Sequence, residues 1–81
     1  MNQNQFEVEG HWYEAMIGSC DLANGVGLCV MITDASSGDE ILDICQVDST
    51  RECHVETYVK DVPSGLMEKA MAMFDERVRL K

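Results

Sequence analysis

The spacing of apolar residues changes once along this chain, from a period of two to a period of about 3.6 residues, near Pro63. Before this point apolar and polar residues alternate, as they do in strands with one buried face. After it the apolar residues fall on one face of a predicted helix: Leu66, Met67, Ala70, Met71, Phe74 and Val78. Strands followed by one helix predict a single two-layer α+β domain over residues 1–81.

The alternating part divides into four predicted strands, at residues 6–17, 26–33, 41–47 and 52–60. Asn24-Gly25 is a strong hairpin signal, and Gly10 is expected to kink or bulge the first strand. We therefore expect a four-stranded antiparallel meander with the C-terminal helix packed on one face.

The ends of the predicted helix carry typical signals. Asp61 or Ser64 is expected to cap its first turn, where Pro63 also fits. Three cations, Arg77, Arg79 and Lys81, suit the negative end of the helix dipole.

The four cysteines include no C-x-x-C pair, so their spacing predicts no zinc site. In a cytoplasmic protein they are expected to be free, buried apolar residues. A turn at Asn24-Gly25 would place Cys20 opposite Cys29, and a turn centred on Ser49 would place Cys45 opposite Cys53.

Charge is distributed unevenly along the chain. Of the fifteen acidic residues twelve lie within residues 1–61, where Arg51 and Lys60 are the only bases, and the net charge of the chain is −9. Such a field repels nucleic acids and anionic lipids and favours basic protein surfaces, although it also serves solubility. Because the sequence has neither a long apolar run nor a signal-peptide pattern at its start, we expect a cytoplasmic protein.

The two middle strands have apolar residues on both of their faces, whereas one helix covers only one. The second face is therefore a candidate interface, for a homodimer or for another partner, unless the N-terminal segment folds over it. In one register this face contains Cys29, Met31, Ile41, Cys45 and Val47.

Signatures of catalysis are missing from the sequence. It contains no phosphate-binding glycine loop, dinucleotide fingerprint or H-E-x-x-H motif. Cys53 and His54 are adjacent, and neighbours on a strand point to opposite faces, so they cannot act as a nucleophile and base. The loop from Asp34 lacks the Gly and Glu positions of a calcium loop. We expect a protein without enzymatic activity, cofactor or metal.

Carboxylates on strands and turns can imitate phosphates toward a protein groove lined with Lys and Arg. The candidate partner-binding residues are concentrated in the third and fourth strands and the turns around them. They are Asp39, Glu40, Asp43, Asp48, Glu52, Glu56 and Tyr58.

The segment Val62-Pro63-Ser64-Gly65-Leu66, followed by Ala70-Met71, resembles the strand-to-helix passage of small phage anti-CRISPR proteins. The resemblance covers about a quarter of the chain. It implies an inhibitor that acts in the host cytoplasm on a CRISPR effector subunit. It assigns no functional residue, because the matched positions belong to the helix cap and the core. The sequence thus predicts a small acidic inhibitor or adaptor, with a homodimeric accessory or structural protein as the alternative.

Overall fold

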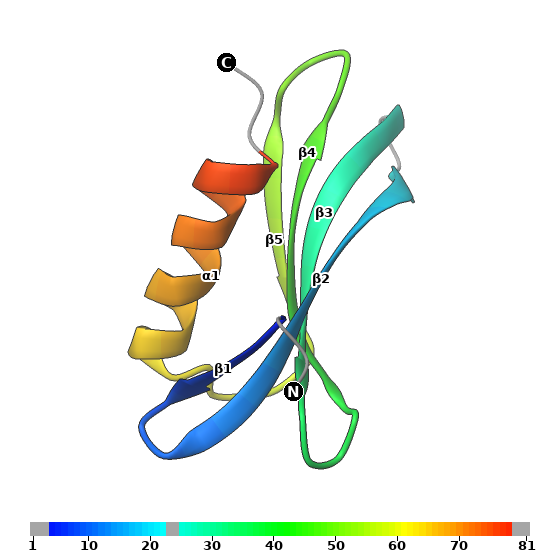
Figure 1. Ribbon diagram of the computed structural model, residues 1–81. Helices are drawn as coiled ribbons and strands as arrows, with labels where there is room; N and C mark the ends of the chain where they lie inside the picture. Colours follow the sequence, from blue (N-terminus) through cyan, green and yellow to red (C-terminus); the bar gives the residue numbers. More distant parts are fainter. Residues whose placement is uncertain (1–3, 23–24, 79–81) are drawn as a thin grey trace.

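A computed structural model describes residues 4–22 and 25–78 of the chain. It has an antiparallel sheet with strand order β1-β2-β3-β4-β5 and one helix beside it (Figure 1). The elements are β1 (Gln5–Val8), β2 (His11–Leu22), β3 (Gly25–Asp34), β4 (Glu40–Val47), β5 (Cys53–Thr57) and α1 (Ser64–Arg77). The predicted α+β class and antiparallel meander are confirmed, but the sheet has five strands and not four.

The additional strand arises at Gly10, where we had expected only a kink or bulge. Glu9 and Gly10 have φ angles of 52° and 81°, and Val8 pairs with His11 across them. A two-residue hairpin turn of this kind needs positive φ at both positions, because its twist then matches that of the strands. The segment from Phe6 to Ile17 is therefore two strands joined by a tight turn.

The strand register differs from the one we predicted, and this changes the neighbours of every cysteine. Leu22 pairs with Gly25, so Gly25 is a strand residue and not the second residue of an Asn24-Gly25 turn; residues 23 and 24 lie outside the described part. Cys20 is consequently opposite Gly27. Both predicted cysteine pairings, Cys20 with Cys29 and Cys45 with Cys53, are wrong.

Helix α1 follows the apolar stripe that its sequence predicts. Leu66, Ala70 and Phe74 are buried within it. Neither Asp61 nor Ser64 caps its start: the N-cap position is Pro63, without a side-chain hydrogen bond, and its carbonyl accepts the first backbone bonds. Of the three predicted cations, Arg77 lies in the last turn, and residues 79–81 lie outside the described part.

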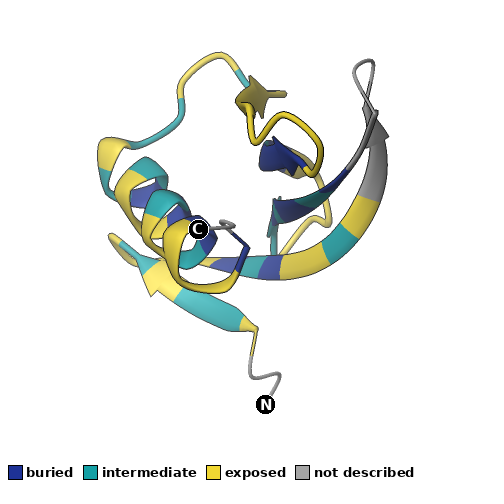
Figure 2. Ribbon diagram, turned by 90° about the horizontal axis from the view of Figure 1, so that it is seen from above, coloured by how far each residue is buried: buried dark blue, intermediate teal, exposed yellow. Residues whose placement is uncertain are grey.

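The core lies between α1 and one face of the sheet. The buried helix residues pack against alternate residues of the three central strands: Tyr13, Ala15, Val30, Ile32, Leu42 and Ile44. Figure 2 shows the helix on the inner side of the curved sheet, with buried segments of the sheet beside it. At the helix start, Gly65 approaches β1 so closely that an added Cβ would lie 3.2 Å from a methyl group of Val8. The start of the helix therefore lies against the edge strand β1 at Val8.

A bulge interrupts the pairing of β3 with β4. Ile32 pairs with Leu42 and Thr33 with Glu40, so Ile41 is the extra residue. It is buried in the same cluster as the helix stripe. Our assignment of Ile41 to a second, exposed face assumed uninterrupted alternation and is wrong for this reason. No helix within the described ranges is long and apolar enough to cross a membrane.

Candidate protein-binding face

The sheet face opposite α1, called here the far face, contains the residues that alternate with the core. The register aligns Met16, Met31, Asp43 and Glu56 in one row across four strands, and Gly18, Cys29, Cys45 and His54 in the next. Paired residues of antiparallel strands point to the same side, so each row lies on one face. The two rows belong to two ends of the far face, which differ in burial and charge.

One end of the far face is closed around a disulfide. Cys29 and Cys45 are directly opposite each other and form a disulfide bond, with their Cα atoms 4.0 Å apart. Cys29, Cys45 and Val47 are buried in the single chain, outside the helix-side cluster, and Met31 is half-buried. These residues therefore do not form the exposed dimer face that we had expected.

The disulfide also corrects the expectation that the cysteines are free. Of the described residues Cys53 is a free cysteine, and it is exposed on β5. Disulfides persist in oxidising compartments, whereas a reducing cytoplasm opens most of them. The state of the Cys29–Cys45 pair therefore depends on where the protein resides.

The other end of the far face is open, and we call it the acidic patch: Trp12, Met16, Glu40, Asp43, Glu56 and Tyr58. Large apolar side chains are exposed in it, with 45% of the surface of Trp12, 51% of Met16 and 44% of Tyr58 accessible. None of the five strands, within the bounds given above, contains a Lys or Arg. The patch therefore combines apolar anchors with uncompensated carboxylates.

Three residues of the patch form its polar centre. Asp43 and Glu56 are cross-strand partners, and the Tyr58 hydroxyl donates a 2.7 Å hydrogen bond to Asp43 Oδ2. This bond, together with the nearby charges of Asp43, Glu56 and Glu40, raises the pKa of Tyr58 well above its usual value, because ionisation would add another negative charge. Two acids directly opposite each other destabilise a sheet. The tyrosine partly offsets this by binding one of them.

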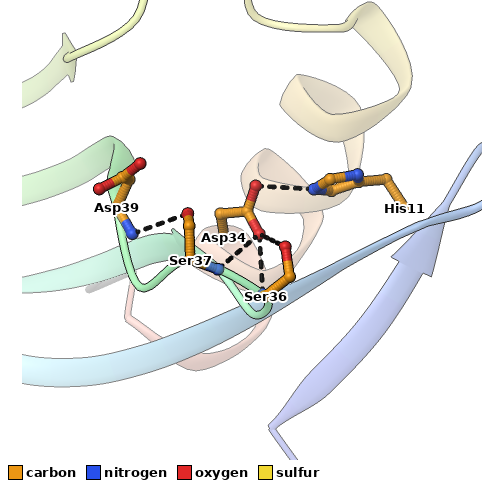
Figure 3. A network of polar contacts seen from close by, with 5 residues as sticks. All are labelled: His11, Asp34, Ser36, Ser37 and Asp39. Atoms are coloured by element: carbon orange, nitrogen blue, oxygen red, sulfur yellow. Dashed lines mark hydrogen bonds and ion pairs between the residues drawn. The ribbon is translucent and has the colours of Figure 1, made fainter.

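The turn beside the patch is fixed by Asp34 at the end of β3 (Figure 3). Its Oδ1 accepts bonds from the Ser36 hydroxyl at 2.6 Å, the Ser36 amide at 2.8 Å and the Ser37 amide at 3.3 Å. Its Oδ2 accepts a 2.7 Å bond from His11 Nε2 on β2. These donors, the Ser36 hydroxyl first and His11 next, hold the pKa of Asp34 far below its usual value. The network ties the β3–β4 turn to β2 and so positions the start of β4.

The structure separates the seven predicted partner-binding residues into two groups. Glu40, Asp43, Glu56 and Tyr58 belong to the acidic patch, and Asp39 lies in the adjoining turn. Asp48 and Glu52 lie in the β4–β5 turn, at the opposite end of β4 (Figure 1).

One carboxylate oxygen of Glu52 also lies 3.6 Å from His54 Nε2. The two turn residues Asp48 and Glu52 thus lie apart from the acidic patch.

Sequence reasoning missed Trp12 and Met16. Both alternate with the buried residues Tyr13 and Ala15, so they point to the far face. The alternation of residues 6–17 indicates this direction, but our sequence prediction treats the N-terminal segment only as a possible cover for the second sheet face.

Within the described residues no group of three or more His, Cys, Asp or Glu side chains could hold a metal ion. Comparisons with protein-family models, with curated proteins and with solved structures find no match for this chain.

Proposed function

We propose that this protein is a small inhibitor or adaptor that binds a basic protein surface through its acidic patch. The observation that carries the proposal is the exposure of Trp12, Met16 and Tyr58 among carboxylates, on a sheet without Lys or Arg. Aromatic residues and Met are enriched at protein interfaces, and Trp and Tyr frequently dominate their binding energy. The carboxylates around them select a partner rich in Lys and Arg.

The pairing of Asp43 with Glu56 supports a role in binding. Because two opposed acids weaken a sheet, the fold alone does not favour this arrangement. Side chains that destabilise the local structure are found most often at functional sites, where the function determines which residue is present. A partner that placed a Lys or Arg between these two acids would remove their repulsion.

The net charge of −9 supports the same class of partner. A field of this sign steers a basic surface toward the patch and speeds association at low ionic strength. A protein groove that ordinarily holds nucleic acid has the required surface, and the protein would then compete with nucleic acid for it. The resemblance to anti-CRISPR proteins adds CRISPR effector subunits to the candidates.

The test compares two double variants with the same change of charge. Glu40→Lys with Asp43→Lys reverses the acidic patch, whereas Glu68→Lys with Glu76→Lys reverses exposed positions of α1. Each variant and the wild type are immobilised and used to capture proteins from host lysate and purified CRISPR effector subunits, at low and high salt. Circular dichroism confirms that each variant is folded.

We expect capture by the wild type and by the helix variant, with less capture at high salt, and none by the patch variant. Equal capture by all three proteins would contradict the proposal and leave solubility as the role of the acidic residues. Trp12→Ala should also reduce capture, because it removes the largest exposed anchor.

A further inference from the structure

Strand β5 forms an exposed edge of the sheet, and its sequence fits a second copy of itself. It lies at the end of the strand order, and all five of its residues, Cys53–Thr57, are exposed. Proteins usually protect such an edge with Lys, Pro, a bulge or a covering segment. Strand β5 contains neither Lys nor Pro, and its pairing with β4 is regular over the residues described.

The hydrogen bonds to β4 show which groups of β5 point outward. Val47 N–H donates to Glu52 O, and Tyr58 N–H donates to Ile41 O, both at 2.9 Å. In an antiparallel pair a residue directs both its N–H and its C=O to the same neighbour, and this alternates along the strand. The even-numbered residues of β5 therefore bond to β4. The N–H and C=O groups of Cys53, Val55 and Thr57 point away from the sheet.

We propose that β5 pairs antiparallel with β5 of a second copy, with the two-fold axis at Val55, to give a continuous ten-stranded sheet. Val55 then pairs with Val55 of the second copy, and Cys53 pairs with Thr57 of the second copy. All outward N–H and C=O groups of these three residues find partners. A symmetric contact of this kind closes on itself and does not lead to fibres.

Charge selects this register among the neighbouring ones. With the axis at Val55, His54 faces Glu56 of the second copy, and this occurs twice. An axis at Glu56 would oppose two glutamates, which is destabilising. An axis at His54 would place Thr57 opposite Arg51, whose φ of 63° is not that of a strand.

The side chains on the core side of β5 favour the same axis. Val55 is 49% exposed at the end of a row that continues through Ile44 and Val30 to Ile17. Pairing at Val55 would bury this side chain against its own copy and join the two apolar rows. The opposite edge differs, because the start of the helix lies against β1 at Val8.

Sedimentation equilibrium of the full chain tests the dimer, with Val55→Pro as the variant. Proline removes the outward N–H of Val55 without removing a bond to β4, and edge strands tolerate it there. We expect a dimer for the wild type and at least a tenfold higher dissociation constant for Val55→Pro. Because two chains of charge −9 repel, added salt should strengthen the dimer, whereas it weakens capture of a basic partner. A wild-type protein that stays monomeric at high micromolar concentration would overturn the proposal.

Cysteine cross-linking tests the register even if the proline variant does not fold. Thr57→Cys, with Cys53 present, should give a covalent dimer on mild oxidation, seen on a non-reducing gel, because residues 53 and 57 face each other across the axis. Thr57→Cys with Cys53→Ser should not, and neither should the wild type, whose two Cys53 residues would lie roughly 13 Å apart, beyond disulfide reach. A cross-link in either control, or none in Thr57→Cys, would overturn the register.

Discussion

The two faces of the sheet use apolar residues in different ways. On the side of α1 the buried residues form one cluster with the helix stripe, from Tyr13 to Val78. On the far face, burial is confined to the end that holds the Cys29–Cys45 disulfide, and the other end exposes Trp12, Met16 and Tyr58. The first face is built for stability, and we infer that the open end of the second is built for contact with a partner. Substitutions should therefore separate the faces, with losses of stability on one and losses of binding on the other.

The largest loss is expected at the centre of the covered face. Phe74 is fully buried, so Phe74→Ala should reduce the free energy of unfolding by about 3–5 kcal/mol, much of the stability of a small domain. Met73→Ala should cause a smaller loss, because Met73 is half-buried beside the core. Urea unfolding followed by circular dichroism measures both changes. Equal losses would show that the helix packs through a different face.

The closed end of the far face should depend on its disulfide. Cross-linking residues 16 positions apart stabilises a protein by about 3 kcal/mol through the loop that it closes. Reduction of the wild type should therefore lower the urea midpoint. Replacing both Cys29 and Cys45 by Ala should abolish the effect of the reductant. If reduction leaves the wild-type midpoint unchanged, the disulfide does not stabilise this end.

The Asp34 network should make stability sensitive to acid. Because its pKa is lowered by folding, the ionised Asp34 stabilises the folded state above the pKa of an unfolded aspartate, and this contribution is lost as pH falls toward the folded value. Asp34→Asn should lower the melting temperature at neutral pH and flatten its decline as the pH falls below about 4, the ordinary pKa of an aspartate. Asp39→Asn, in the same turn, is the control. Parallel curves for wild type and Asp34→Asn would contradict this role.

The smallest change in stability is expected in the acidic patch. Tyr58→Phe removes the hydroxyl bond to Asp43 at an exposed site, so the free energy of unfolding should fall by at most about 1 kcal/mol. Capture of a basic partner should nevertheless change, since Asp43 loses its internal donor. A loss of stability as large as that of Phe74→Ala would place Tyr58 with the core and not with the binding face.

Periodicity predicted those parts of the fold that depend on contacts between near neighbours in the chain. The helix stripe from Leu66 to Val78 and the alternation of His54 and Glu56 with Val55 are confirmed, because each follows from the repeat of its own element. The Glu9–Gly10 turn was missed, since a glutamate in its first position is not a common hairpin signal. One unrecognised turn changed the number of strands.

Which residues lie together in the candidate site depends on the pairing between strands. The sequence by itself determined that the region of the sheet is acidic and that Trp12 and Tyr13 point to opposite sides. The predicted fourth strand, residues 52–60, includes Lys60, and only the structure ends this strand at Thr57, so that the sheet contains no Lys or Arg. Only the tertiary structure decided that Cys29 meets Cys45, that Ile41 joins the core at a bulge, and that Asp48 lies far from Asp43. The reason is that a shift in register or one extra residue changes the neighbours of every side chain on a strand, while the local alternation of the sequence stays the same.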